Sequence, residues 1–118
     1  YATLFRSVSP IALWSLRPAN IAELAFQELR PGVDIHVLHD APDGARAAIL
    51  RYAPGAQVPA HRHEGYEYIY VLEGEQSDER GSYGAGAFVV NEPGMAHSVT
   101  SKSGCTVLII WQRPVVFL

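Results

Sequence analysis

Residues 55–74 read GAQVPAHRHEGYEYIYVLEG, a stretch that sets two histidines and a glutamate in a segment of β-type sequence. His61 and His63 are two residues apart, and residues of that spacing on a strand point to the same face of the sheet. After a turn, Glu67 opens a second strand, EYIYVL, whose alternate residues also share one face. We therefore expect the carboxylate to converge on the two imidazoles from the neighbouring strand.

A third imidazole is expected from His97, which follows a Pro-Gly turn in the segment NEPGMAHSV, residues 91–99. Three imidazoles and the carboxylate of Glu67 would then face one point. These ligands suit zinc, iron, manganese or nickel, and the residue types alone do not choose among the four metals.

The spacing resembles the first cupin motif, G-x5-H-x-H-x3-E-x6-G, with agreement at every fixed position: Gly55, His61, His63, Glu67 and Gly74. The second cupin motif, G-x5-P-x-G-x2-H-x3-N, is similar to the segment that contains Gly86, Pro93 and His97. There the gap before Pro93 is one residue longer, Gly94 follows Pro93 directly, and Ser101 stands in place of the motif's asparagine.

A closer likeness covers about residues 33–112. The segments RYAPGAQVPAHRH, VLEGEQSDERGSYGAGAFV and PGMAHS resemble the cupin domains at the C-terminus of anti-sigma factors of the ChrR type. That resemblance implies one zinc ion held by the four residues that match the family's ligands: His61, His63, Glu67 and His97.

The fold expected from turn signals and from this resemblance is all-β. From Val33 onward, short strands alternate with Gly, Pro and Asp turn signals every eight to twelve residues or so, a rhythm typical of a sandwich or small barrel. We predict one domain, a jelly-roll-like double-stranded β-helix of eight or nine strands over residues 33–118. Residues 1–32 are expected to form an irregular arm that packs on the barrel or on a partner, with Leu13, Trp14 and Phe26 as its covering side chains.

Composition excludes several partners. The chain has 118 residues, a net charge of -3 and 18% charged residues, which gives no basic surface for nucleic acid. The longest run without a charged residue, 81–91, is too short to span a membrane. Cys105 is the single cysteine, so no intrachain disulfide forms and a cytoplasmic location is expected. The sequence begins at Tyr1 without a methionine, which leaves open what preceded it.

Several other residues have ordinary explanations. His36 and His39 are three apart and are expected on opposite faces of a hairpin. Arg46 and Arg51 are expected in solvent, although an inward arginine would indicate an anionic substrate. Cys105 is expected to be buried.

Two further groups are assigned by pattern. The alternating Tyr66, Tyr68 and Tyr70 are expected to pack against the opposite sheet or an interface. The cavity is expected to be lined by Ile69, Val71, Phe88 and Val90 or their neighbours, and the acidic hairpin residues are expected in solvent: Glu73, Glu75, Asp78 and Glu79.

Two functions follow from the site. The first is a metal-dependent sensing or binding module that resembles the ChrR cupin domain, without the zinc-containing sigma-binding domain, which residues 1–118 do not include. The alternative is an iron- or nickel-dependent dioxygenase or isomerase acting on a small organic molecule in the barrel. In either case we expect a homodimer and a small-molecule ligand, and no catalytic residue is assigned.

Overall fold

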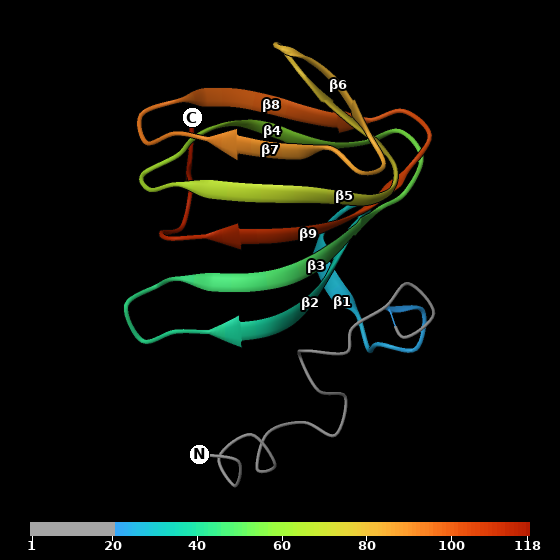
Figure 1. The fold of residues 1–118 in the computed structure, drawn as a ribbon, viewed down its shortest axis with the longest axis horizontal. Helices are drawn as coiled ribbons and strands as arrows, with labels where there is room; N and C mark the ends of the chain where they lie inside the picture. The colour runs from blue at the N-terminus through green and yellow to red at the C-terminus, as the bar shows by residue number, and fades with distance from the viewer. Residues whose placement is uncertain (1–20) are drawn as a thin grey trace, which may run out of the picture.

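A computed structural model of the protein describes residues 21–118, so the predicted covering role of Leu13 and Trp14 lies outside the described residues. The regular structure of the described part is ten β-strands (Figure 1): β1 (Gln27–Arg30), β2 (Val33–Asp40), β3 (Arg46–Tyr52), β4 (Ala56–Arg62), β5 (Glu67–Asp78), β6 (Gly81–Gly84), β7 (Phe88–Asn91), β8 (Ala96–Ser101), β9 (Cys105–Trp111) and β10 (Val116–Phe117). This confirms the all-β prediction, with nine strands from Val33 onward. Within residues 21–118, no helix has the length and apolar character needed to span a bilayer.

The strands form one curled sheet in the order β1-β2-β3-β9-β5-β8-β4-β10, with β6 and β7 paired to β5. β5 is the strand at which the sheet turns. Its first part pairs with β9 and β7, whereas its last residues pair with β6 and, through Ser77, with Thr100 of β8. In Figure 1, β8, β4 and β7 therefore lie together above β5, and β9, β3 and β2 lie below it.

The bend in β5 depends on Gly74. Its φ is +73°, a left-handed conformation that residues with a Cβ adopt at a cost. A Cβ at this position would also collide with the carbonyl oxygen of Gly104. The last fixed position of the first motif is therefore a glycine because the chain bends there and a second backbone segment passes against it.

The concave side of the sheet holds the hydrophobic core. Strands β2, β3, β5 and β9 supply most of its members, of which the most deeply buried are Val33, Ala48, Val71 and Val107. Cys105 belongs to the same cluster, which confirms that it is buried. One end of this interior remains open, and the motif residues gather there.

The second motif departs from its pattern at Ser101, and the structure shows the consequence. Ser101 is fully buried, and its hydroxyl donates a hydrogen bond of 2.6 Å to the carbonyl oxygen of Glu75. Its carbonyl oxygen accepts a hydrogen bond of 2.8 Å from the amide of Gly55. The serine thus ties the end of β8 to β5 and to the turn before β4.

Candidate metal centre

The paired strands β4 and β8 hold His61 and His97 opposite each other. His61 on β4 lies directly opposite His97 on β8, and a bulge before His61 at Pro59 and Ala60 shifts the register of this pair of strands. His63 follows the end of β4, and its backbone exchanges hydrogen bonds with the turn before β8, with Gly94 as donor and the Met95 carbonyl as acceptor.

The three imidazoles meet at one point. His61, His63 and His97 each offer a ligand atom, and these atoms lie within 4.8 Å of one another. The Nε2 atoms of His63 and His97 are 3.0 Å apart. All three side chains are buried. The structure therefore confirms the prediction that these three histidines converge.

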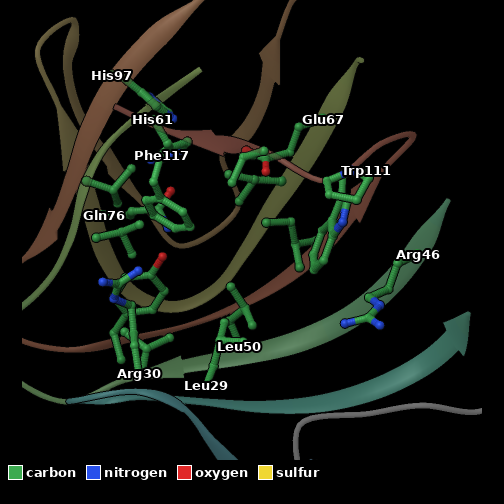
Figure 2. Close-up of a pocket in the computed structure, with 18 of the residues that line it drawn as sticks. Leu29, Arg30, Arg46, Leu50, His61, Glu67, Gln76, His97, Trp111 and Phe117 are labelled. Carbon is green, nitrogen blue, oxygen red and sulfur yellow. The ribbon is translucent and has the colours of Figure 1, made fainter. Parts of the chain in front are cut away.

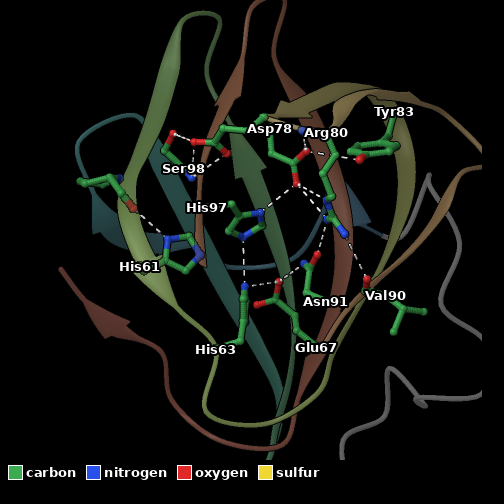
Figure 3. A network of polar contacts seen from close by, with 12 residues as sticks. His61, His63, Glu67, Asp78, Arg80, Tyr83, Val90, Asn91, His97 and Ser98 are labelled. Carbon is green, nitrogen blue, oxygen red and sulfur yellow. Dashed lines mark hydrogen bonds and ion pairs between the residues drawn. The ribbon is translucent and has the colours of Figure 1, made fainter. Parts of the chain in front are cut away.

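Glu67 stands at the first position of β5 and is also buried. Its Oε1 lies 3.7 Å from Nε2 of His63, so it reaches the edge of the histidine cluster. Figure 3 shows the carboxylate beside His63 and below His97. The structure thus brings all four predicted ligands to one end of the barrel, with the three histidines as the tighter group.

Hydrogen bonds at Nδ1 orient two of the rings. His61 donates from Nδ1 to the Pro59 carbonyl oxygen at 2.8 Å, and His97 donates from Nδ1 to Oδ2 of Asp78 at 2.8 Å. A ring that carries its proton on Nδ1 keeps the lone pair on Nε2. Both rings therefore hold a lone pair available to a metal, which is the usual arrangement of metal-binding histidines.

A polar chain surrounds the ligands (Figure 3). Arg80 pairs with Asp78 at 2.9 Å and donates to the side-chain oxygen of Asn91, whose amide in turn donates to Oε1 of Glu67 at 2.8 Å. Because Asp78 also holds His97, one arginine connects the environments of two predicted ligands.

The electrostatics favour unprotonated imidazoles. Burial, followed by the charges of His97, His61 and Arg80, lowers the pKa of His63 to about 4, and burial also lowers the pKa of His61. Burial raises the pKa of Glu67 to about 7, against the hydrogen bond from Asn91. Burial alone would raise the pKa of Asp78, but hydrogen bonds from Arg80 and His97 lower it to about 2.

These residues fit a divalent metal. The pKa values of His61 and His63 are lowered, the rings of His61 and His97 carry oriented lone pairs, and the cluster is buried. The Nε2 atoms of His63 and His97 lie close together, and the Glu67 carboxylate lies near His63. Imidazole nitrogens with a neighbouring carboxylate are donors that transition metals bind. Three histidines are thus positioned to bind a metal ion.

A cavity of about 410 Å³ extends from the site into the barrel. His61, His97 and Glu67 line one side of it, and most of the remaining wall is apolar (Figure 2). Small-molecule sites in proteins commonly measure about 300–1,000 Å³. The histidine cluster therefore opens onto a space large enough for an organic molecule.

The acidic hairpin residue Asp78 was expected in solvent, and that expectation is wrong. Its side chain is 4% exposed because the end of β5 folds over β8 and against His97. Asn91, fully buried beside Glu67, was not singled out by any motif. The pairing of Asn91 with Glu67 across β7 and β5 is a long-range contact that no local pattern reveals.

The assignment of facing on β7 was reversed. Phe88 and Val90 were expected in the cavity, but both are exposed, and Val89 is buried in their place. Tyr66 and Tyr70 are exposed, so they do not pack against the opposite sheet, and Tyr68 stacks between Tyr66 and Phe88. The alternative, that these tyrosines pack at an interface, stays a prediction. The exposed aromatic residues share the outer face of β5 and β7.

Arg46 was expected in solvent, but it lines the cavity together with Trp111 and also pairs with Asp40 at 3.1 Å. Arg51 pairs with Asp34 at 3.6 Å on the surface. His39 is exposed, as expected.

Comparisons with known proteins agree with this geometry. The sequence model described as the ChrR cupin-like domain matches residues 17–115. The anti-sigma-E factor ChrR of Cereibacter sphaeroides is 31% identical over 116 residues, which are 95% of this chain and 52% of that protein. The chain thus spans about half the length of that curated relative.

Solved structures show the same fold. ChrR in complex with SigE of Rhodobacter sphaeroides superposes with a TM-score of 0.68 at 22% identity, covering 93% of this chain and 73% of that chain. An acetylacetone dioxygenase from Acinetobacter johnsonii gives a TM-score of 0.75 at 15% identity, covering 88% of this chain and 75% of that chain. At these identities the likeness establishes the cupin barrel, which confirms the predicted fold class.

Proposed function

The chain belongs to the family of ChrR cupin-like domains, and from this premise we propose that it is a metal-dependent sensing or binding module. In this proposal His61, His63, Glu67 and His97 hold one divalent ion, zinc in the first instance. A molecule that enters the cavity reaches the ion and changes how the module contacts another protein domain.

The observation that carries the proposal is the convergence of Nε2 lone pairs. His61 and His97 have their Nδ1 protons occupied by Pro59 and Asp78, so both rings present Nε2 as a ligand atom. A bound divalent ion would supply Lewis acidity at the cavity wall. The protein's own residues bury the four side chains and fix the orientations of the His61 and His97 rings.

The test is elemental analysis of protein purified without added metal. We expect about one zinc per chain in the wild type. His61→Ala and His97→Ala each remove one ring from the cluster, and we expect both to lose most of the metal while circular dichroism still reports a folded barrel. His39→Ala, on the exposed end of β2, is the matched control and should keep full occupancy. Full occupancy in both cluster variants would refute the ligand assignment.

A second candidate function is supported by the open cavity beside the cluster. A dioxygenase or isomerase needs a metal with room for substrate, and the cavity of about 410 Å³ supplies that room. Iron or nickel in the purified protein, together with a small molecule or exchangeable water on the ion, would favour this function. Zinc with no exchangeable ligand would exclude it.

The assembly and location also remain proposals. β1 and β10 are the end strands of the sheet order, and edge strands of this kind are common places of pairing between subunits. We propose a homodimer in the cytoplasm. Light scattering on the purified chain tests the first part, since a mass near 12.9 kDa would show a monomer.

A further inference from the structure

Arg30 lies at the wall of the cavity, on a strand that the sequence did not predict. It ends β1, and its side chain lines the cavity opposite the histidine cluster (Figure 2). The guanidinium carbon sits 5.0 Å from the centre of the Phe117 ring. A cation over an aromatic face is stabilised by the ring quadrupole, so this contact holds the guanidinium at the cavity.

Arg30 has no acidic partner among residues 21–118. Four other arginines of the described chain form ion pairs with carboxylates: Arg46, Arg51, Arg62 and Arg80. Arg30 forms no ion pair or side-chain hydrogen bond with any residue from 21 to 118, and residues 1–20 contain no Asp or Glu. Its guanidinium therefore has hydrogen-bond donors available to a ligand that enters the cavity.

Phe117 sets the distance between the two ends of the cavity. Its ring centre is 5.8 Å from that of His61 and 5.0 Å from the guanidinium carbon of Arg30. The two groups are therefore separated by no more than the sum of these distances. A short organic molecule is long enough to contact Arg30 with one end and to approach the histidine cluster with the other.

The space between these ends is apolar. Its wall is formed chiefly by aliphatic side chains of β2, β3, β4, β5, β8 and β9: Val33, Leu50, Val58, Ile69, Val99 and Ile109. At the rim, Leu29 and Phe117 are half exposed, so apolar surface continues to the entrance. Such a wall favours a hydrocarbon body over a sugar or other highly hydroxylated molecule.

The charge balance of the cavity favours an anion. Two carboxylates line it, Asp40 and Glu67, and Asp40 is already paired with Arg46. With a divalent ion at the histidines, the single charge of Glu67 cannot neutralise both the ion and Arg30. Tyr52 and Gln76, both buried at the wall, add polar groups that can bond to an oxyanion.

We propose that the cavity binds a small organic carboxylate with an apolar body, whose carboxylate pairs with Arg30 and whose far end approaches the metal centre. This inference rests on the proposed function, because it names the ligand class of the same site. Arginine binds carboxylates through two parallel N–H donors, which gives both affinity and orientation.

The experiment is calorimetric titration of the zinc-loaded full chain with straight-chain carboxylates from butanoate to decanoate, and with the corresponding neutral amides. We expect the best carboxylate to bind about tenfold or more tightly than its amide, the scale of a charge-assisted hydrogen bond. Arg30→Gln should abolish that preference and leave amide binding and zinc content unchanged. Inorganic phosphate is the second arm, and tighter binding of phosphate than of every carboxylate would overturn the ligand class.

Arg51→Gln is the matched control, because Arg51 pairs with Asp34 on the surface and does not line the cavity. It should keep the preference for carboxylate. The proposal is overturned if no carboxylate outbinds its amide, or if Arg30→Gln keeps the preference. If the wild type fails to bind zinc, the proposed function fails, and the same titrations on the metal-free chain still test the pairing with Arg30.

Discussion

The Nδ1 of His97 donates a 2.8 Å hydrogen bond to the carboxylate of Asp78, whose side chain is as buried as the histidine it holds. Asp78 stands at the end of β5, and His97 near the start of β8, nineteen residues later in the chain. The bond fixes which nitrogen of His97 faces the cluster. Asp78 is thus a positioning residue for the candidate metal centre.

Asp78→Asn is therefore expected to weaken zinc binding by about 10- to 100-fold, the range found when hydrogen-bond partners of metal-binding histidines are removed. The asparagine can donate its amide N–H to Nδ1 of His97, which favours the tautomer with the proton on Nε2 and removes the lone pair that faces the cluster. Competition with a chelator of known affinity measures the change. Glu79→Gln, on the exposed neighbour that accepts hydrogen bonds from Ser98, is the control and should bind zinc normally. Equal affinities of all three proteins would contradict the positioning role.

Gly74 and Gly55, both fixed positions of the first motif, should respond differently to alanine. Both have positive φ, +73° and +83°, so each substitution carries a backbone cost of about 1–2 kcal/mol. Only at position 74 does the added Cβ collide with backbone, since nothing lies within 4 Å of it at position 55. Urea denaturation should show a larger loss of unfolding free energy for Gly74→Ala than for Gly55→Ala. Equal losses would show that the passing Gly104 segment yields freely.

Glu75 should make stability depend on pH. Hydrogen bonds from the Ser103 amide and hydroxyl lower its pKa below the ordinary 4.5, so folding favours the ionised form. The contribution of Glu75 is fully present above about pH 4.5 and is lost as the pH falls through the lower folded pKa.

Glu75→Gln should consequently be less stable than the wild type at pH 7, and this difference should shrink as the pH falls below 4.5. Urea titrations at pH 7, 5, 4 and 3 measure it. Glu73→Gln, on the same strand and without a hydrogen bond to its side chain among the described residues, should show no such trend. A difference that stays constant down to pH 3 would rule out Glu75 as the source.

Cys105 should resist thiol reagents in the folded protein. It is buried in the core cluster, and burial raises the pKa of its thiol, so access and thiolate formation are both reduced. We expect labelling by a disulfide reagent at pH 8 to be at least about 100-fold slower than in urea, because it requires opening of the core. Labelling at the same rate in both conditions would place the thiol at the surface.

The convergence of the candidate ligands was predictable because short-range geometry determines much of their arrangement. The alternation of a strand puts His61 and His63 on one side, and a turn returns the chain so that Glu67 follows within reach. His97 was placed by its own turn at Pro93 and Gly94. The Nε2 atoms of His97 and His63 come within 3.0 Å of each other because β4 pairs with β8. That pairing is not visible in the local sequence, and only the match to the cupin motif indicated it.

The surrounding residues were not predictable in this way. Asp78 sits among acidic residues of a polar hairpin, and only the curl of β5 over β8 buries it. Arg30 lies on a four-residue strand with three exposed positions, which gives no alternating pattern. Phe88 and Val90 were assigned to the wrong side. The sequence of a strand as short as β7 does not fix its register, and a shift of one residue exchanges the two faces.

Arg80 bonds to both Asp78 and Asn91, so the supports of His97 and Glu67 end on the same guanidinium at the tip of a hairpin. Loss of the Arg80 side chain would remove one hydrogen-bond partner from each of Asp78 and Asn91. Through these contacts the hairpin tip between β5 and β6 is joined to the residues that hold His97 and Glu67 in place.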